Sequence, residues 1–234
     1  MAAADSSPPS SRPSGDRAWA GRLRRAERQR TTKETDVFVR LDLDGSGSTS
    51  IDTGLPFFDH MLAQLGRHGG FDLELRVRGD LAVDAHHSVE DAGITLGEAL
   101  GVALGDKAGV RRFASIALPL DEALVDVALD LSGRGFLHYA VDFAPNAAPL
   151  GEPRFEPQLA EEFWRALVGS AAVTLHVNLR YGRNTHHILE ASFKAVARAL
   201  RDAVRVEGGG IPSTKGILSS AAAPASAPAP APPA

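Results

Sequence analysis

Apolar and polar positions alternate in several short stretches between residues 34 and 182. In ETDVFVRLDL, residues 34–43, every second side chain from Val37 onward is apolar, and the same period recurs at 71–77, 122–133, 135–143 and 173–182. Because successive side chains of a strand point to opposite faces, this period predicts strands with one buried face.

Apolar residues at helical spacing separate these strands. In PFFDHMLAQLGRHGG, residues 56–70, they recur three and four positions apart, and the proline and the paired glycines suit the two ends of a helix. The same spacing predicts helices at 86–104, 155–170 and 186–204, the last being the most amphipathic. The predicted order is strand, helix, strand, helix, repeated once.

The two halves share a motif. Aligning DAHHSVEDAG with NTHHILEASF, at an offset of 100 residues (186 minus 86), pairs His86 with His186, His87 with His187 and Glu90 with Glu190. Each copy follows a predicted strand and starts a predicted helix. We infer an internal duplication, with halves of approximately 31–108 and 109–218.

Both ends of the chain differ in composition from this region. Residues 1–30 are rich in Ser, Pro, Ala and Arg without an apolar segment, which excludes a secretory signal and predicts a disordered extension. An organellar transit peptide is the alternative, against which Asp5 and Asp16 argue. Residues 219–234 are almost entirely Pro, Ala and Ser and are expected to be disordered.

Composition narrows the possible chemistry. The chain has no cysteine, so imidazole and carboxylate groups would have to hold any transition metal. The net charge of −4 gives no basic surface for nucleic acid. No apolar run approaches the roughly 18 residues of a membrane span. These features favour a cytoplasmic enzyme or binding protein acting on small molecules.

The duplicated motif is a candidate metal site. Residues four apart lie on one face of a helix, so His86 and Glu90 can approach one cation while His87 points elsewhere, which indicates two metals. A solvated helix start explains one such motif equally well. Two copies favour metal binding, because vicinal histidines and a buried glutamate are costly unless paired or ligated. His60, on the preceding predicted helix, is a further candidate ligand or else a core or capping histidine.

Four segments together resemble the imidazoleglycerol-phosphate dehydratase family: FFDHMLAQLGRHGGFDL, DAHHSVEDAGITLGEAL, NTHHILEASFKAVARAL and IPSTKGIL. The likeness runs from about Thr31 to Leu218. It implies an α+β fold of tandem duplicated ββαβα units, in which two four-stranded sheets flank a four-helix bundle (ribosomal protein S5 domain 2-like). It also implies a homo-oligomer of 24 subunits with active sites at the interfaces and two Mn²⁺ in each.

The resemblance also implies two ligand sets. The first comprises His60, His87, His186 and Glu190, and the second comprises His86, Glu90, His187 and residue 162. The family pattern has histidine at this last position, where the chain has Glu162. A carboxylate can still bind manganese with altered affinity, or neither Glu161 nor Glu162 is a ligand.

The substrate-binding positions follow from the same resemblance. They are Glu34, Gln64, His68, Arg112, Arg134, Lys194, Ser213 and Lys215, and cations with a hydroxyl suit a phosphate dianion. Each arginine alone could equally be a surface charge. The segment GGGIPSTKG lacks the spacing of a nucleotide-binding loop, which argues against a nucleotide hydrolase.

The implied reaction is dehydration of D-erythro-imidazoleglycerol phosphate to imidazole-acetol phosphate in histidine biosynthesis, by a metal-dependent hydro-lyase. Because the C2 hydrogen is not acidic, we expect metal-stabilised imidazolate to expel hydroxide and Glu34 to remove the C2 proton. Two alternatives stay open. In the first, the metals only stabilise an oligomer, which leaves the phosphate-binding residues without a purpose. In the second, the protein is a binuclear hydrolase of phosphorylated substrates.

Overall fold

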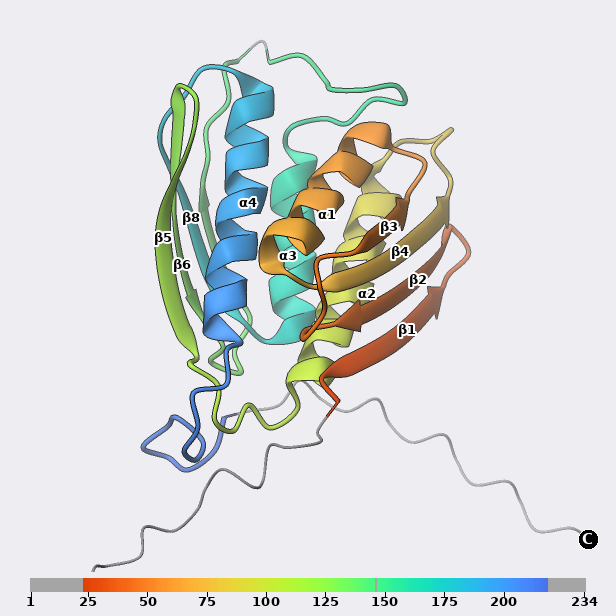
Figure 1. Ribbon diagram of the computed structural model, residues 1–234. Helices are drawn as coiled ribbons and strands as arrows, with labels where there is room; N and C mark the ends of the chain where they lie inside the picture. The colour runs from red at the N-terminus through yellow and green to blue at the C-terminus, as the bar shows by residue number, and fades with distance from the viewer. Residues whose placement is uncertain (1–22, 146, 219–234) are drawn as a thin grey trace, which may run out of the picture.

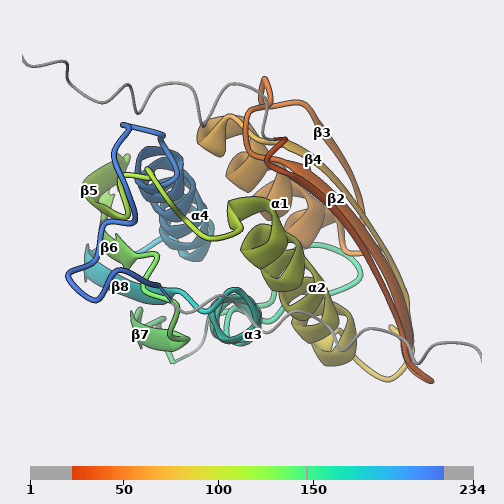
Figure 2. The ribbon, with the colours of Figure 1, turned by 90° about the horizontal axis from the view of Figure 1, so that it is seen from below.

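A computed structural model describes residues 23–145 and 147–218. Two four-stranded sheets enclose four helices, as the end-on view makes plain (Figures 1 and 2). This confirms the expected α+β class and layering. Residues 1–22 and 219–234, which include most of the predicted extension and the predicted tail, lie outside the described residues.

The elements follow the same order in both halves. The first half contains β1 (Arg25–Thr31), β2 (Thr35–Asp42), β3 (Thr49–Asp52), α1 (Pro56–Gly69), β4 (Asp72–Gly79) and α2 (His86–Leu104). The second contains β5 (Phe113–Leu120), β6 (Ala123–Asp130), β7 (Phe136–Ala140), α3 (Leu159–Ala171), β8 (Thr174–Tyr181) and α4 (Thr185–Ala203).

Sheet topology shows the duplication directly. The strand orders are β1-β2-β4-β3 and β5-β6-β8-β7. In each sheet the third strand of the half pairs in parallel with the fourth, and the other pairs are antiparallel. Each half therefore has three strands before its first helix, one more than the expected ββαβα unit.

Three strands were not predicted from the sequence. β1 begins at Arg25, inside the stretch 1–30 that was expected to be disordered, and this expectation is wrong for its last residues. Its side chains are mostly polar, and Ala26 alone is buried, because β1 is an edge strand. β3 has only four residues, and β5 has no fully buried side chain. β1 and β3 carry no clear alternation of apolar residues, whereas β5 does, at Ile116, Leu118 and Leu120, and was overlooked.

The core lies between the sheets, and the helix contacts join one half to the other. α1 packs against α4, and α2 packs against α3. Glycine permits the second contact, because a Cβ at Gly93 would lie 2.6 Å from the Phe163 carbonyl oxygen. No helix in the described ranges has the length and apolar character to cross a bilayer.

Candidate metal and substrate site

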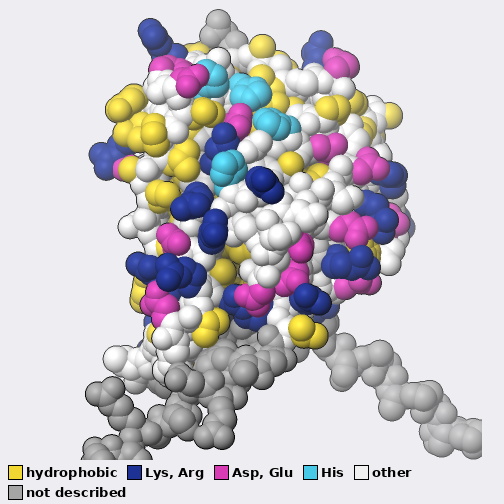
Figure 3. Space-filling model, in the orientation of Figure 1, with side chains coloured by type: hydrophobic (Ala, Val, Ile, Leu, Met, Phe, Trp, Pro, Cys, Tyr) yellow, Lys and Arg dark blue, Asp and Glu magenta, His cyan; other side chains and the backbone are white. Residues whose placement is uncertain are grey.

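Histidine side chains gather where α1 lies beside α4, with lysine and arginine side chains close to them (Figure 3). The Nε2 atom of His186 lies 3.0 Å from a Glu190 carboxylate oxygen, and the Nε2 atom of His60 lies 3.5 Å from the same oxygen. One donor atom from each residue lies within 4.8 Å of the others. In the described part of the chain, this is the one group of three such side chains that could hold a metal ion.

The start of α4 sets the direction of its two histidines. The Asn184 side chain accepts hydrogen bonds from the backbone N–H groups of His186 (2.9 Å) and His187 (3.2 Å), which caps the helix. His186 and Glu190 then lie four residues apart on the face toward α1, and His187 points to another side. The expected separation of the vicinal histidines is therefore present.

A polar row along α1 and α4 continues from this group. Lys194 lies 2.7 Å from the second Glu190 oxygen. Burial opposes ionisation of Glu190, but the Lys194 bond and charge, with His186, outweigh it and lower the pKa of the carboxyl. Gln64 lies between His60 (3.4 Å) and His68 (3.0 Å). Burial and the neighbouring charges of Lys194 and Arg198 lower the pKa of His68.

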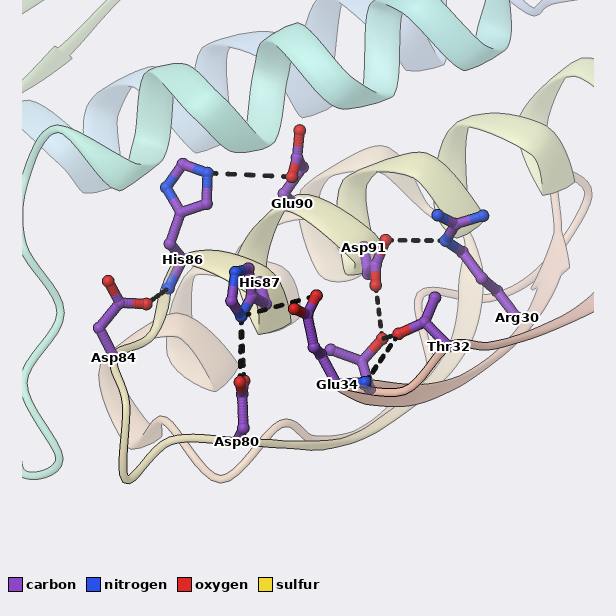
Figure 4. Close-up of polar contacts among 10 residues, drawn as sticks. Arg30, Thr32, Glu34, Asp80, Asp84, His86, His87, Glu90 and Asp91 are labelled. Atoms are coloured by element: carbon purple, nitrogen blue, oxygen red, sulfur yellow. Dashed lines mark hydrogen bonds and ion pairs between the residues drawn. The ribbon is translucent and has the colours of Figure 1, made fainter.

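His87 belongs to a different group, at the start of α2 with Asp80 and Glu34 (Figure 4). Its Nδ1 atom lies 3.1 Å from Asp80 and 3.9 Å from Glu34, and the Asp80 hydrogen bond raises the pKa of the imidazole. Glu34 is held at the start of β2 by its backbone N–H, which donates to Thr32 Oγ1 at 3.1 Å. Apart from the 3.9 Å contact with His87, the Glu34 side chain is open to solvent, with 54% of it exposed.

His86 and Glu90 lie on a further side of the same helix. The His86 Nε2 atom is 3.8 Å from the Glu90 carboxylate, and its backbone N–H donates to Asp84 at 2.8 Å (Figure 4). Both side chains are more than 40% exposed. The pair predicted to share one cation is therefore adjacent, as the helical spacing requires.

His187 pairs with a residue that the sequence did not single out. Its Nδ1 atom lies 2.7 Å from Glu122, whose other oxygen accepts the backbone N–H groups of Arg183 (3.1 Å) and Asn184 (2.8 Å). These bonds, the His187 bond first, lower the pKa of Glu122 to about 2.

The structure thus brings together part of each predicted ligand set. From the first set, His60, His186 and Glu190 meet, whereas His87 has the partners described above. From the second set, His86 and Glu90 are adjacent, but His187 pairs with Glu122. Glu162 lies 3.9 Å from Arg165, and Glu161 also pairs with that arginine.

Among the predicted phosphate residues, Arg112 contacts the C-terminal segment, whereas Lys194 pairs with Glu190 on α4. Arg112 donates to both oxygens of Asp130 (2.7 and 3.1 Å) and to the carbonyl oxygen of Pro212 (2.7 Å). The Ser213 hydroxyl accepts the backbone N–H of Lys215 at 3.2 Å. Arg134 and Lys215 are exposed. Arg112 in this arrangement ties the Ser213 segment to the second sheet.

Sequence reasoning missed Asp80 and Glu122, the carboxylates at the Nδ1 atoms of His87 and His187. A usable signal existed for Glu122. It stands one residue before β6, as Glu34 stands one residue before β2. Extending the alignment of the halves to their first strands would have paired the two glutamates.

Comparisons with known proteins point to a single family. Residues 53–200 match the family model described as imidazoleglycerol-phosphate dehydratase. Proteins of that name from Frankia casuarinae and Acidothermus cellulolyticus are 55% and 56% identical to the chain, over 83% of its length and 99% and 93% of theirs.

Solved structures agree as well. Imidazoleglycerol-phosphate dehydratase from Staphylococcus aureus superposes with a TM-score of 0.69 and 35% identity, covering 78% of this chain and 99% of that one. The structure from Pyrococcus furiosus gives 0.70 and 37%, covering 82% and 100%. Fold, site and relatives together define a metal-dependent hydro-lyase. The chain belongs to the imidazoleglycerol-phosphate dehydratase family.

Proposed function

We propose that this chain removes water from D-erythro-imidazoleglycerol phosphate to give imidazole-acetol phosphate, in the cytoplasm and with two Mn²⁺ per active site. The convergence of His60, His186 and Glu190 carries the proposal, because it brings the predicted ligands of two separate motifs to one point. Imidazole and carboxylate donors together suit manganese and other divalent transition metals.

The donor set fits a metal ion. The Nε2 atoms of His60 and His186 both face one Glu190 carboxylate oxygen. A cation between these three atoms could be bound by all of them. We assign His60, His186 and Glu190 to the first ion, with His87 as the fourth ligand. We assign His86, Glu90, His187 and Glu162 to the second. When bound, the metals supply Lewis-acid stabilisation of negative charge on the imidazole ring.

His87 and His186 lie in different groups of the chain, so we propose that each active site is completed by a neighbouring subunit. The second sheet offers exposed aromatic side chains for association, Phe113 and Phe136 (each 54% exposed) at one end and Tyr181 (62%) at the other. Closed symmetry then generates one copy of the shared site for every subunit. We propose the 24-subunit assembly of the family for this chain.

Glu34 is our candidate for the base that removes the C2 proton. It is more than half exposed, and Asp80 occupies the nearer position at His87, so the Glu34 carboxylate remains available to a substrate. A positioned carboxylate can contribute on the order of 10²–10⁴-fold to turnover. The same residue can return the proton when the enol product becomes the ketone.

The phosphate group, at the opposite end of the substrate from the imidazole ring, requires cationic side chains. We assign the phosphate to Arg134, Lys194, Ser213 and Lys215. Arg112 completes this end by holding the Ser213 segment through the Pro212 carbonyl bond, while Asp130 fixes the arginine itself. Gln64 and His68 continue the row from His60 and would contact the substrate between the metals and the phosphate.

The direct test incubates purified protein with Mn²⁺ and imidazoleglycerol phosphate. We expect ketone formation without phosphate release, and metal removal by a chelator should abolish it. Release of inorganic phosphate would instead support a binuclear hydrolase. Absence of both reactions, in protein that binds Mn²⁺, would support metals that serve assembly alone.

A further inference from the structure

Glu34 and Glu122 occupy the same position in the two halves of the duplicated fold. Each directly precedes the second strand of its half, β2 or β6. Within the sheets the strand registers agree, since Val37 pairs with Val77 and Val125 pairs with Leu179. Beside Glu122 the register of β6 and β8 shifts between Leu124 and Val125, whereas β2 and β4 pair without a shift.

Their surroundings nevertheless differ. Glu34 is 3.9 Å from His87, where Asp80 is the nearer acceptor at 3.1 Å. Glu122 makes the close contact with His187 itself, at 2.7 Å. The fold position of Asp80, directly after β4, is taken after β8 by Gly182, which has no carboxylate. The carboxylate nearest the histidine Nδ1 atom therefore follows β4 in the first half and precedes β6 in the second half.

We propose that Glu122 is a positioning residue that holds His187 through Nδ1, so that its Nε2 atom, 3.8 Å from Asp121, can bind a metal ion, and that Asp80 does the same for His87. A carboxylate that accepts a hydrogen bond from the Nδ1–H group fixes the imidazole tautomer and the ring orientation. In the first half Asp80 holds the histidine, so Glu34 is not needed for that role and can contact the substrate. This inference rests on the proposed function and assigns different roles to the two equivalent glutamates.

The geometry of Glu122 makes Glu122→Gln a selective probe. A glutamine oxygen can keep both bonds to the backbone N–H groups of Arg183 and Asn184, so the turn stays in place. Its amide NH₂ then faces His187 and donates to Nδ1. The ring proton must move to Nε2, the atom required for the metal. If Glu122 had a purely structural role, Glu122→Gln would have little effect on Mn²⁺ affinity.

We expect Glu122→Gln to bind Mn²⁺ about 10–100-fold more weakly at one of its sites in titration calorimetry. The metal-free variant should fold with a somewhat lower thermal midpoint, because the hydrogen-bonded charge of Glu122 is lost, and excess Mn²⁺ should restore most of the turnover. Asp80→Asn should weaken the other site. Glu98→Gln, an exposed carboxylate elsewhere on α2, is the matched control.

Wild-type Mn²⁺ affinity in Glu122→Gln would overturn the inference, whatever its stability. A turnover defect that excess Mn²⁺ does not relieve would also overturn it, because Glu122 would then act on the substrate. Failure of the wild-type protein to bind Mn²⁺ or to form the ketone would refute the proposed function instead, so the two failures are distinguishable.

Discussion

At the scale of single residues, the free carboxylate of Glu34 gives the sharpest prediction about catalysis. Glu34→Gln keeps the side-chain shape but removes the base, so turnover should fall on the order of 10²–10⁴-fold. Mn²⁺ content and assembly should not change, because Glu34 is not among the proposed ligands. Steady-state kinetics with metal analysis checks this, and near-normal turnover would remove Glu34 from the mechanism.

Asp72 gives a prediction about stability and pH. Its carboxylate accepts the backbone N–H groups of Ser48 (3.0 Å) and Ser46 (2.8 Å), which lower its pKa below the ordinary 3.8. A depressed pKa contributes stability above the unfolded-state value, and the contribution is lost as the pH falls through the folded-state value. Asp72→Asn should therefore be less stable than wild type at pH 7, with the difference shrinking below pH ~4.

Denaturant titrations of both proteins across this pH range would test the prediction. An equal difference in unfolding free energy at acid and neutral pH would show that the Asp72 charge is not responsible.

Part of the site was predictable at this scale. Helical spacing alone places Glu190 beside His186, and Glu90 beside His86. The meeting of His60 with Glu190 depends on α1 packing against α4, which only the family resemblance implied. The roles of Asp80 and Glu122 depend on where the chain turns between elements, and hydrophobic periodicity carries no information about such positions.

At the scale of elements, the contact between α2 and α3 should depend on glycine. A Cβ at Gly93 would meet the Phe163 carbonyl at 2.6 Å and the Ala166 Cβ at 2.9 Å, both too close without a shift of backbone. We expect Gly93→Ala to destabilise the protein by about 1–3 kcal/mol, despite the higher helix propensity of alanine.

Gly169 in α3 provides the control, since a Cβ there meets nothing within 4 Å. Gly169→Ala should be neutral or stabilise by about 0.5–1 kcal/mol. Chemical denaturation compares the two variants with wild type. Equal effects of both substitutions would contradict the close approach of the helices.

Elements with a strong apolar pattern were predicted well. All four helices and the strands β2, β4, β6, β7 and β8 fall where periodicity placed them. β1 and β3 were missed because edge position or short length removes the alternation on which the prediction depends. β5 does alternate, at Ile116, Leu118 and Leu120, but these side chains are only partly buried and the strand was overlooked. The resemblance implied two four-stranded sheets, but the order of strands within each sheet was not predicted, since periodicity does not specify partners.

At the scale of the whole molecule, a shared active site predicts complementation. His87→Ala and His186→Ala should each lose Mn²⁺ and activity. If these ligands come from neighbouring subunits, mixed assemblies should recover about a quarter of wild-type activity, because random mixing leaves both donors intact at about one site in four. Unfolding and refolding the variants together, then assaying, tests this. Each variant refolded alone is the control, and no recovery would place both ligands within one subunit.

The helix layer has a consequence for the origin of the chain. The contacts between helices join the halves, with α1 on α4 and α2 on α3. A polypeptide with only one such unit would leave two apolar helix faces in water, and a second copy of the unit would cover them. The duplication therefore completes the core, and it gives the chain two copies of each position that need not carry the same residue.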